Sequence, residues 1–348
     1  MSLDDKVLIA CHRIEDLWHQ SEGKCYISFS GGKDSTVVLA LVKLCVDALT
    51  LPAEGIRAVF DNTGVEMGIT VEFVKWCKEN WYPNIEIIRP EKSFDWCLKT
   101  YGKPMKSKLR SEFIGRYQDG NRSESLMMNL IDGVTKKGVR ARGTVLADKD
   151  MHMLHPDFKI HATPKCCTVL KKKPFLKYAK ENNIKGMIYG IRQAEGGARD
   201  LNAFERQKKN LQPCTSIKNG IIQKAPIIDW TDEDIEEFIQ KYNVPLSKAY
   251  TEFGFHRTGC MGCPFGLTIV HNLRYLHDHE PNRYRASMHW LKDVYIAQNI
   301  KLPFDPEYER EREQKWDQEY EPMRQEMLRL YRPKSRLIKD FTETKLFY

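Results

Sequence analysis

The 348-residue sequence predicts an α/β fold built on a doubly wound, mostly parallel sheet. Two observations predict this class. Short apolar runs typical of buried strands alternate along the chain with longer stretches that are apolar at helical spacing. The first of these runs leads directly into a glycine-rich turn and then a helix, and ligands of such sheets bind at the carboxyl ends of the strands.

Each element can be justified in chain order. Residues 3–20, 36–51 and 71–81 predict helices, because apolar side chains recur there at intervals of three and four. Strands are expected where short apolar runs are bounded by polar or glycine-containing turns. These runs are residues 25–27, 56–60, 85–88 and 186–190. Residues 308–331, near the end of the chain, are heavily charged and again apolar at helical spacing.

The stretch between the third and fourth predicted strands is too long for one crossover helix and indicates an insertion, at about residues 101–163. Residues 101–173 hold 16 Lys and Arg against 7 Asp and Glu, although the net charge of the whole chain is only +8. Such a surplus favours a polyanionic partner, most naturally nucleic acid, and a solvated surface insertion is the alternative. We expect a domain over residues 1–266 and a helical extension over residues 267–348.

The composition narrows the class of protein. The N-terminus lacks the pattern of a secretory signal, and no apolar run approaches the length of a membrane span. A cytoplasmic protein without a membrane partner is therefore expected. Ten cysteines in a chain of this length favour free thiols, metal ligands or core positions over a disulfide scaffold.

The glycine-rich turn, residues 28–36, reads Ser-Phe-Ser-Gly-Gly-Lys-Asp-Ser-Thr. Gly31 and Gly32 permit a turn in which consecutive N–H groups point at one anion, at the positive end of the following helix. Ser30 and Ser35 add hydroxyl donors. Lys33 follows the glycine pair directly, so the turn differs from a Walker A loop. The sequence therefore predicts a phosphate-binding loop, and a turn without a ligand is the alternative.

This loop resembles the pyrophosphate loop (PP-loop) of the N-type ATP pyrophosphatases, which split ATP between its α and β phosphates. The resemblance implies ATP and Mg²⁺ as ligands. Lys33 would neutralise the β and γ phosphates, and Asp34 would help to hold Mg²⁺ or fix the loop; a solvated lysine and a helix-capping aspartate are the alternatives. The nucleotide-binding residues implied are Ser28, Ser30, Gly31, Gly32, Lys33, Asp34, Ser35, Asp61, Thr63 and Gly190. Asp61 and Thr63 would lie near the adenosine or its ribose, and a simple turn is the other interpretation.

Four cysteines form two pairs, the adjacent Cys166 and Cys167 and the C-x-x-C of Cys260 and Cys263. Four thiolates suit either Zn²⁺ or an iron–sulfur cluster, and the spacing alone leaves both open. Neighbouring side chains on a strand point to opposite faces. The adjacent pair can therefore converge only from a helix start or an irregular turn, which the preceding Pro164 allows.

These pairs extend the resemblance to the sulfonucleotide reductases, the family of the adenylylsulfate and phosphoadenylylsulfate (PAPS) reductases. Over about residues 22–266 the order of the motifs is similar: Lys165-Cys166-Cys167, then Gly190-Ile191-Arg192 with Arg199, then Pro226 to Trp230, then the C-x-x-C. The resemblance implies an adenine nucleotide alpha-hydrolase-like, Rossmann-like fold and a [4Fe-4S] cluster on all four cysteines, with structural zinc or buried free thiols as alternatives. Arg192 and Arg199 would contact phosphate or sulfate oxygens, and surface salt bridges are the other interpretation.

Two departures from the reductase pattern shape the expected function. Reductases of this type attack sulfate with a cysteine near the C-terminus, whereas no cysteine follows Cys263 here. Their phosphate loop is typically degenerate, whereas here it is intact. We therefore expect an enzyme that adenylates an acceptor, releases pyrophosphate and supports sulfur transfer, with Lys33, Asp34, Arg192 and Arg199 as catalytic residues. A nucleic acid is the expected acceptor, and a sulfur-donor protein is an expected partner.

Two other functions stay open. One is a sulfonucleotide reductase whose missing thiol is supplied by another chain. The other is a nucleotide- or nucleic-acid-binding protein that kept the loop without the chemistry.

Overall fold

The computed structural model describes residues 1–136, 138–140, 143–195, 214–266 and 268–332. The chain forms two compact units, each made of two separate stretches of sequence. The first unit comprises residues 1–91 and 170–259, and the second comprises residues 92–169 and 260–348. The basic insertion and the C-terminal helices thus belong to one unit. The domain limits expected at residues 1–266 and 267–348 stay a prediction.

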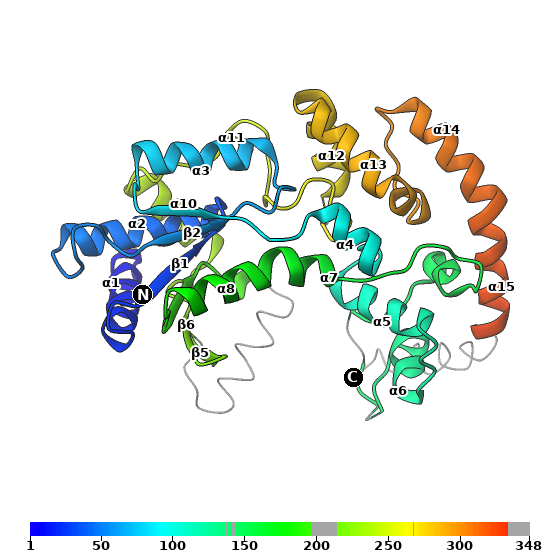
Figure 1. Cartoon of the computed structure of the whole chain (residues 1–348), viewed down its shortest axis with the longest axis horizontal. Coiled ribbons are helices and arrows are strands. Elements are labelled where there is room, and N and C mark those ends of the chain that lie inside the picture. Colours follow the sequence, from blue (N-terminus) through cyan, green and yellow to red (C-terminus); the bar gives the residue numbers. More distant parts are fainter. Residues whose placement is uncertain (137, 141–142, 196–213, 267, 333–348) are drawn as a thin grey trace. The chain divides into compact units, whose positions relative to one another are not determined.

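A six-stranded sheet with the order β3-β2-β1-β4-β6-β5 forms the centre of the first unit (Figure 1). Its strands are β1 (Cys25–Phe29), β2 (Ala58–Asp61), β3 (Ile85–Ile88), β4 (Gly186–Tyr189), β5 (Thr215–Lys218) and β6 (Ile221–Lys224). Neighbouring strands are parallel except for β5, which runs antiparallel to β6. Ile27 of β1 lies beside Ala58 of β2 and Ile188 of β4. The mostly parallel sheet predicted from the sequence is confirmed.

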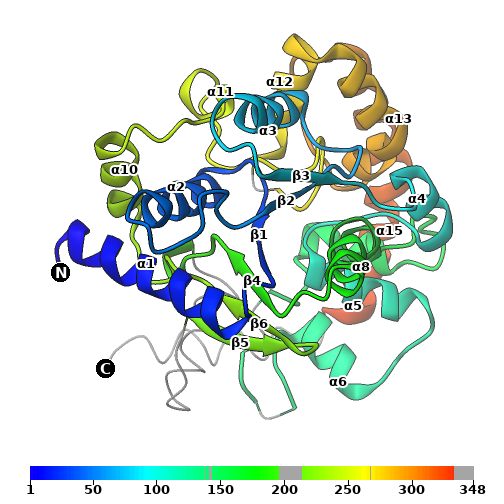
Figure 2. The same ribbon diagram turned by 60° about the vertical axis from the view of Figure 1, so that its left-hand side comes forward.

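Helices pack on both faces of this sheet (Figure 2). They are α1 (Leu3–Gln20), α2 (Lys33–Asp47), α3 (Gly68–Asn80), α8 (Lys173–Glu181) and α10 (Asp232–Lys241). The short helix α11 (Lys248–Thr251) packs against α3. Because successive strand residues point to opposite faces, Ile27 and Phe60 join a core shared with α1, α2, α3 and α10. Tyr26 and Val59 form a separate core with Tyr178 of α8. The fold is therefore doubly wound, as predicted.

Two local features explain where the first helices begin. Ser2 caps α1 in a reciprocal capping box with Asp5, which accounts for a start at Leu3. Helix α2 begins at Lys33, three residues before the predicted start, because Gly32 is extended and serves as the N-cap. The basic residue of the loop therefore lies in the first turn of α2, at the positive end of its dipole.

The second unit is helical. Its α-helices are α4 (Phe94–Tyr101), α5 (Lys108–Gln118), α6 (Glu124–Met127), α7 (Lys165–Cys167), α12 (Ile269–His279), α13 (Pro281–Ala297), α14 (Pro306–Lys315) and α15 (Glu321–Tyr331). Arg332, which follows α15, donates hydrogen bonds to the carbonyl oxygens of Ile131 and Leu146. The end of the described chain is thereby tied to the insertion. Among the helices that the structure describes, none is both long and apolar enough to cross a membrane.

Candidate functional site

The phosphate loop connects β1 to α2, and its serines hydrogen-bond within the loop itself. The Ser35 hydroxyl donates to the carbonyl oxygen of Gly32 at 2.8 Å and lies 3.0 Å from the Ser30 hydroxyl. The Ser30 hydroxyl oxygen also accepts the amide of Gly32 at 3.3 Å. The two serines that the sequence assigned to ligand binding therefore also fix the shape of the loop. Ser28 lies earlier, within β1.

Two glycines are required here by space and backbone conformation. Gly31 has φ +69°, and a Cβ at this position would lie 2.9 Å from a methyl group of Val74. Gly190, just after β4, faces the start of α2. A Cβ at position 190 would lie 2.7 Å from the carbonyl oxygen of Asp34. The end of β4 and the first turn of α2 are therefore in direct backbone contact, which explains why the sequence has glycine at position 190.

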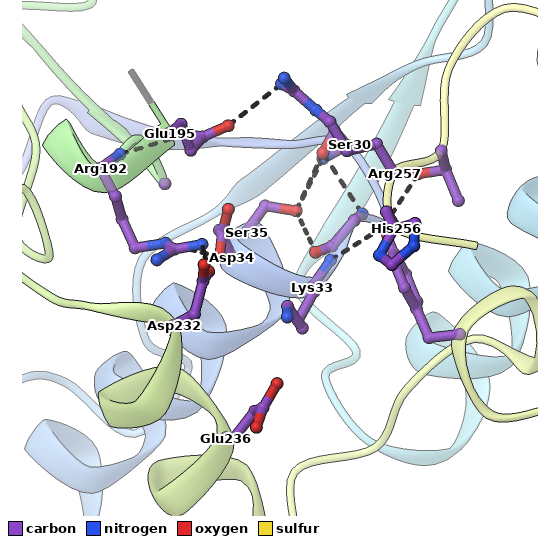
Figure 3. A pocket seen from close by; sticks show the side chains of 14 residues that line it. Ser30, Lys33, Asp34, Ser35, Arg192, Glu195, Asp232, Glu236, His256 and Arg257 are labelled. Atoms are coloured by element: carbon purple, nitrogen blue, oxygen red, sulfur yellow. Dashed lines mark hydrogen bonds and ion pairs between the residues drawn. The ribbon is translucent and has the colours of Figure 1, made fainter. Parts of the chain in front are cut away.

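A cavity of about 410 Å³ opens over the loop within the first unit. Its lining residues are Ser30, Gly32, Lys33, Asp34, Ser35, Gly190, Arg192, Glu195, Asp232, Glu236, Tyr250, His256, Arg257 and Thr258. The structure thus brings most of the predicted loop residues together with Gly190 and Arg192 around one space (Figure 3). Its volume lies within the range typical of small-molecule sites.

Arg192 is held by carboxylates on two sides (Figure 3). Its Nε donates to Oδ1 of Asp34 at 3.0 Å, and its Nη2 donates to Oδ1 of Asp232 at 2.7 Å. The side chain of Arg192 is only 4% exposed. The hydrogen bond from Arg192 lowers the pKa of Asp232, which is the first residue of α10. Arg192 thus ties the loop to α10, and its predicted contact with a ligand stays a prediction.

The other cations of the cavity differ in their partners. Arg257 pairs with Glu195 at 3.1 Å, and its side chain is mostly exposed. Lys33 lines the cavity and makes no ion pair with any residue that the structure describes. Lys33 is therefore the cavity cation whose charge is not already matched by a bonded carboxylate among the described residues.

Asp61 and Thr63 form a separate buried group at the end of β2 and are not among the residues that line the cavity. The Thr63 hydroxyl donates to Glu66 at 2.9 Å, and Glu66 also pairs with Lys171 at 3.0 Å. Asp61 is 7% exposed, and neither carboxylate oxygen has a hydrogen-bond partner among the described residues. Burial raises the pKa of Asp61 to about 7.

Arg199, the remaining residue predicted for the nucleotide site, lies outside the described residues. Five cavity residues received no site role from the sequence: Glu195, Asp232, Glu236, Tyr250 and Thr258. They come from α10, from α11 and its following loop, and from the turn after Arg192, so no local motif joins them. His256 and Arg257, which precede the C-x-x-C motif, also line the cavity.

The four paired cysteines all belong to the second unit. Cys166 and Cys167 lie in the short helix α7 after Pro164, the helix start that the sequence allowed. The amide of Cys263 donates to the carbonyl oxygen of Cys260 at 3.3 Å. The pKa of Cys166 is raised, chiefly by its hydrogen bond with Cys167 and then by burial, with contributions from the thiolates of Cys260 and Cys263. The thiols of Cys260 and Cys263 are thus near enough to Cys166 to affect its pKa.

Whether these four thiols hold an iron–sulfur cluster or a single Zn²⁺ ion stays a prediction. In the part of the chain that the structure describes, no three His, Cys, Asp or Glu side chains are grouped as one bound metal ion would require. A [4Fe-4S] cluster takes four thiolates, each on a different iron, so the sulfur atoms need not converge on one point.

Several cations of the insertion form ion pairs. Lys103 pairs with Asp293 and Lys106 with Asp150, and the second pair is largely buried. Lys136 and Lys159 also have acidic partners. Lys108, Arg116 and Lys149 are exposed and make no ion pair with a described residue. Three of the four pairs use acidic residues of the same segment, so they leave its surplus of positive charge unchanged.

Comparison with curated proteins finds relatives of low identity. The chain is 23% identical to an uncharacterized protein of Methanocaldococcus jannaschii over 69% of this chain and 41% of that protein. It is 21% identical to a phosphoadenosine 5'-phosphosulfate reductase of Vibrio campbellii over 68% of this chain and 65% of that enzyme. The chain spans about two fifths of the length of the archaeal relatives that it matches.

Among solved structures, the PAPS reductase of Candida auris aligns over 71% of this chain and 87% of that one. The TM-score of this alignment is 0.40 and the identity is 13%. A family model described as phosphoadenosine phosphosulfate reductase domain matches residues 24–126 and 122–265, more than half of the sequence. This match confirms the resemblance inferred from the loop and the cysteine pairs: the chain belongs to the phosphoadenosine phosphosulfate reductase domain family.

Proposed function

We propose that this chain is a PP-loop enzyme that cleaves ATP between its α and β phosphates, adenylates an acceptor and thereby supports sulfur transfer. The observation that carries the proposal is that the Lys33 ammonium group lines the cavity without an ion pair to a described residue. Lys33 extends from the first turn of α2 into the cavity, while Arg192 is bonded to two carboxylates. An unpaired ammonium group at a helix N-terminus suits the β and γ phosphates of ATP.

The acidic residues of the cavity favour a metal–nucleotide complex over a bare anion. Asp34, Asp232 and Glu236 line the same space as the loop. Asp34 and Asp232 share the single positive charge of Arg192, so these carboxylates keep a net negative charge that repels a free sulfonucleotide. Mg²⁺, in contrast, is commonly held by one or two carboxylates together with substrate phosphates. Asp34 uses Oδ1 for Arg192, which leaves Oδ2 for this role. The donor set therefore fits Mg²⁺, which would neutralise part of the triphosphate charge.

The proposed reaction is an in-line displacement at the α phosphorus. An acceptor oxygen forms the new bond to phosphorus, the bond to the β-phosphate oxygen breaks, and pyrophosphate leaves. Charge then builds on the pyrophosphate, where Lys33 and the first amides of α2 stabilise it. Arg192 acts in this scheme as a positioning residue, because it holds Asp34 and Asp232 at fixed places.

The four cysteines supply the link to sulfur. Cys166, Cys167, Cys260 and Cys263 would hold a [4Fe-4S] cluster, which carries electrons or sulfide when bound. Zinc is the alternative metal. We further propose a sulfur-donor protein as a partner that would supply the sulfur.

A nucleic acid is the proposed acceptor. The support is the exposed, unpaired cations of the insertion, of which Lys108 and Arg116 lie on α5. Arg116 also lies over the ring of Phe113, a geometry in which a guanidinium can still reach a phosphate group. Lys108 and Arg116 would contact the phosphate groups of the nucleic acid backbone, and binding would weaken as the salt concentration rises.

A second candidate function is the reduction of a sulfonucleotide, with the attacking thiol supplied by another chain. The family match favours it, because the relatives include enzymes named as PAPS reductases. A protein that binds nucleotide without turnover is the third candidate.

One set of assays separates the three. Anaerobically prepared protein is incubated with ATP and Mg²⁺, alone or with transfer RNA or duplex DNA, and pyrophosphate is measured. Pyrophosphate release that requires an acceptor and is lost in Lys33→Ala supports the proposal, and Lys75→Ala, an exposed lysine of α3, is the matched control. Sulfite formed from a sulfonucleotide and a thiol reductant would favour the second candidate. Tight nucleotide binding without any product would favour the third.

A further inference from the structure

Tyr250 contacts the phosphate loop directly. The amide of Lys33, the first residue of α2, donates to the Tyr250 hydroxyl oxygen at 3.2 Å. The same hydroxyl lies 3.3 Å from the hydroxyl of Thr258. Both residues line the cavity over the loop. The Tyr250 hydroxyl oxygen therefore accepts a hydrogen bond from one of the N-terminal amides of α2.

That amide is one of the groups that a phosphate would need. The first amides of a helix have no partner within the helix, and they are the donors that hold bound phosphates. Here the amide of Gly32 is taken by Ser30 and the amide of Lys33 by Tyr250. A Cβ at position 32 would lie 3.4 Å from the Tyr250 hydroxyl oxygen and 3.6 Å from that of Thr258. Neutral hydroxyl groups thus surround the point where an anion would bind.

The segment that carries these hydroxyl groups is well anchored. Ser247 caps α11, and the amide of Phe255 donates to the carbonyl oxygen of Ala249 at 2.9 Å. Ala249 and Phe255 are both buried. The position of Tyr250 is therefore fixed by its own segment, and the hydroxyl contact with the loop is the part that a ligand can replace.

We infer that Tyr250 is a positioning residue that caps the phosphate loop and yields the Lys33 amide to a phosphate oxygen when nucleotide binds. The inference rests on the proposed function, because it takes the loop as the phosphate site. The Tyr250 hydroxyl competes with the phosphate for one donor, and Thr258 orients that hydroxyl. Part of the binding free energy of the phosphate is then used to break the hydrogen bond between the Lys33 amide and the Tyr250 hydroxyl.

Pyrophosphate binding to the full chain, measured by titration calorimetry, tests this competition. Tyr250→Phe removes the hydroxyl and keeps the ring, so it should bind pyrophosphate about two- to tenfold more tightly, the range that one net hydrogen bond gives. Thr258→Val should act in the same direction with a smaller effect. The control is Tyr82→Phe, which loses a buried hydrogen bond to the carbonyl of Ile56 away from the cavity and should leave the affinity unchanged.

A second measurement does not depend on affinity. Amide hydrogen exchange of the peptide that contains Lys33 should be faster in Tyr250→Phe than in the wild type without ligand, and equally slow in both with saturating pyrophosphate. Weaker or unchanged pyrophosphate binding by Tyr250→Phe would overturn the inference. Failure of the proposed function has a different signature: the affinity ratio and exchange pattern hold, but ATP yields no pyrophosphate.

Discussion

The Nε atom of Arg192 lies 3.0 Å from Oδ1 of Asp34, so a residue that follows β4 holds a residue of the phosphate loop. The same guanidinium bonds to Asp232 at the start of α10. Three segments that are far apart in the sequence are thus joined by one buried cation. The arrangement explains how the loop keeps its shape beside a cavity that contains several carboxylates.

Replacing Arg192 should destabilise the first unit. Arg192→Met leaves the carboxylate of Asp34 without its partner in a largely buried place, and loss of one partner of a buried pair costs about 3 kcal/mol or more. Urea unfolding at neutral pH measures this loss. Asp232→Asn should cost less than about 1 kcal/mol, because the Asp232 side chain is 66% exposed. An Arg192→Met protein as stable as the wild type would contradict this role.

Lys33 should govern phosphate affinity without affecting the fold. Lys33→Ala removes a cavity cation that has no bonded carboxylate among the described residues. The affinity for ATP with Mg²⁺ should fall by roughly ten- to a hundredfold, since a charge-assisted hydrogen bond contributes about 1.5–3 kcal/mol. Thermal unfolding should be unchanged. Equal ATP affinities for Lys33→Ala and the control Lys75→Ala would contradict the assignment.

Asp61 should make the stability of the first unit depend on pH. Its pKa is about 7 in the folded protein against an ordinary value of 3.8, so the folded state holds a proton that the unfolded state loses. Stability should therefore fall as the pH rises from about 4 to about 7. The ionisable groups around Asp61 are Glu66 and Lys171, which pair with each other.

Asp61→Asn should remove this slope. The variant should match the wild type near pH 4 and exceed it in free energy of unfolding at pH 8, when both are measured by urea unfolding. The same decline in both proteins would show that another group is responsible.

The cysteine pairs should bind iron. Anaerobically purified protein should be brown and contain about four irons per chain, as a [4Fe-4S] cluster requires. Cys260→Ser and Cys166→Ser should both lose the broad visible absorbance. Cys97→Ser, which changes a buried cysteine outside the two pairs in the same unit, should keep it. Stoichiometric zinc without iron would overturn the cluster assignment.

The parts of the fold that the sequence predicted are those with strong local patterns. Helix α1 matches its predicted bounds, because a capping box starts it and an apolar stripe runs through it. The first four strands were found as apolar runs. The hairpin of β5 and β6 was missed because its strands are short and partly exposed. Its turn, Asn219-Gly220, has positive φ at both residues and is a strong hairpin signal that was available in the sequence.

For the candidate site as well, the sequence predicted the residues of a contiguous motif and missed those that only the fold brings to the cavity. The loop is a contiguous motif, so Ser30 to Ser35 were identified from sequence alone. Tyr250 and Glu236 reach the cavity only through the fold, from helices more than 200 residues after the loop. Arg192 was found, but its bonded partners were not, because the sequence cannot show that Asp34 and Asp232 lie on either side of it.

The measurement that most directly tests the central claim is the identity of the bond that breaks in ATP. The cluster-loaded protein is incubated with γ-labelled ATP, Mg²⁺ and a nucleic acid acceptor, and the labelled products are separated. Cleavage between the α and β phosphates predicts labelled pyrophosphate, in an amount equal to the AMP released or attached to the acceptor, and none with Lys33→Ala. Labelled inorganic phosphate with ADP, or unreacted ATP alongside sulfite formation from a sulfonucleotide, would contradict the account.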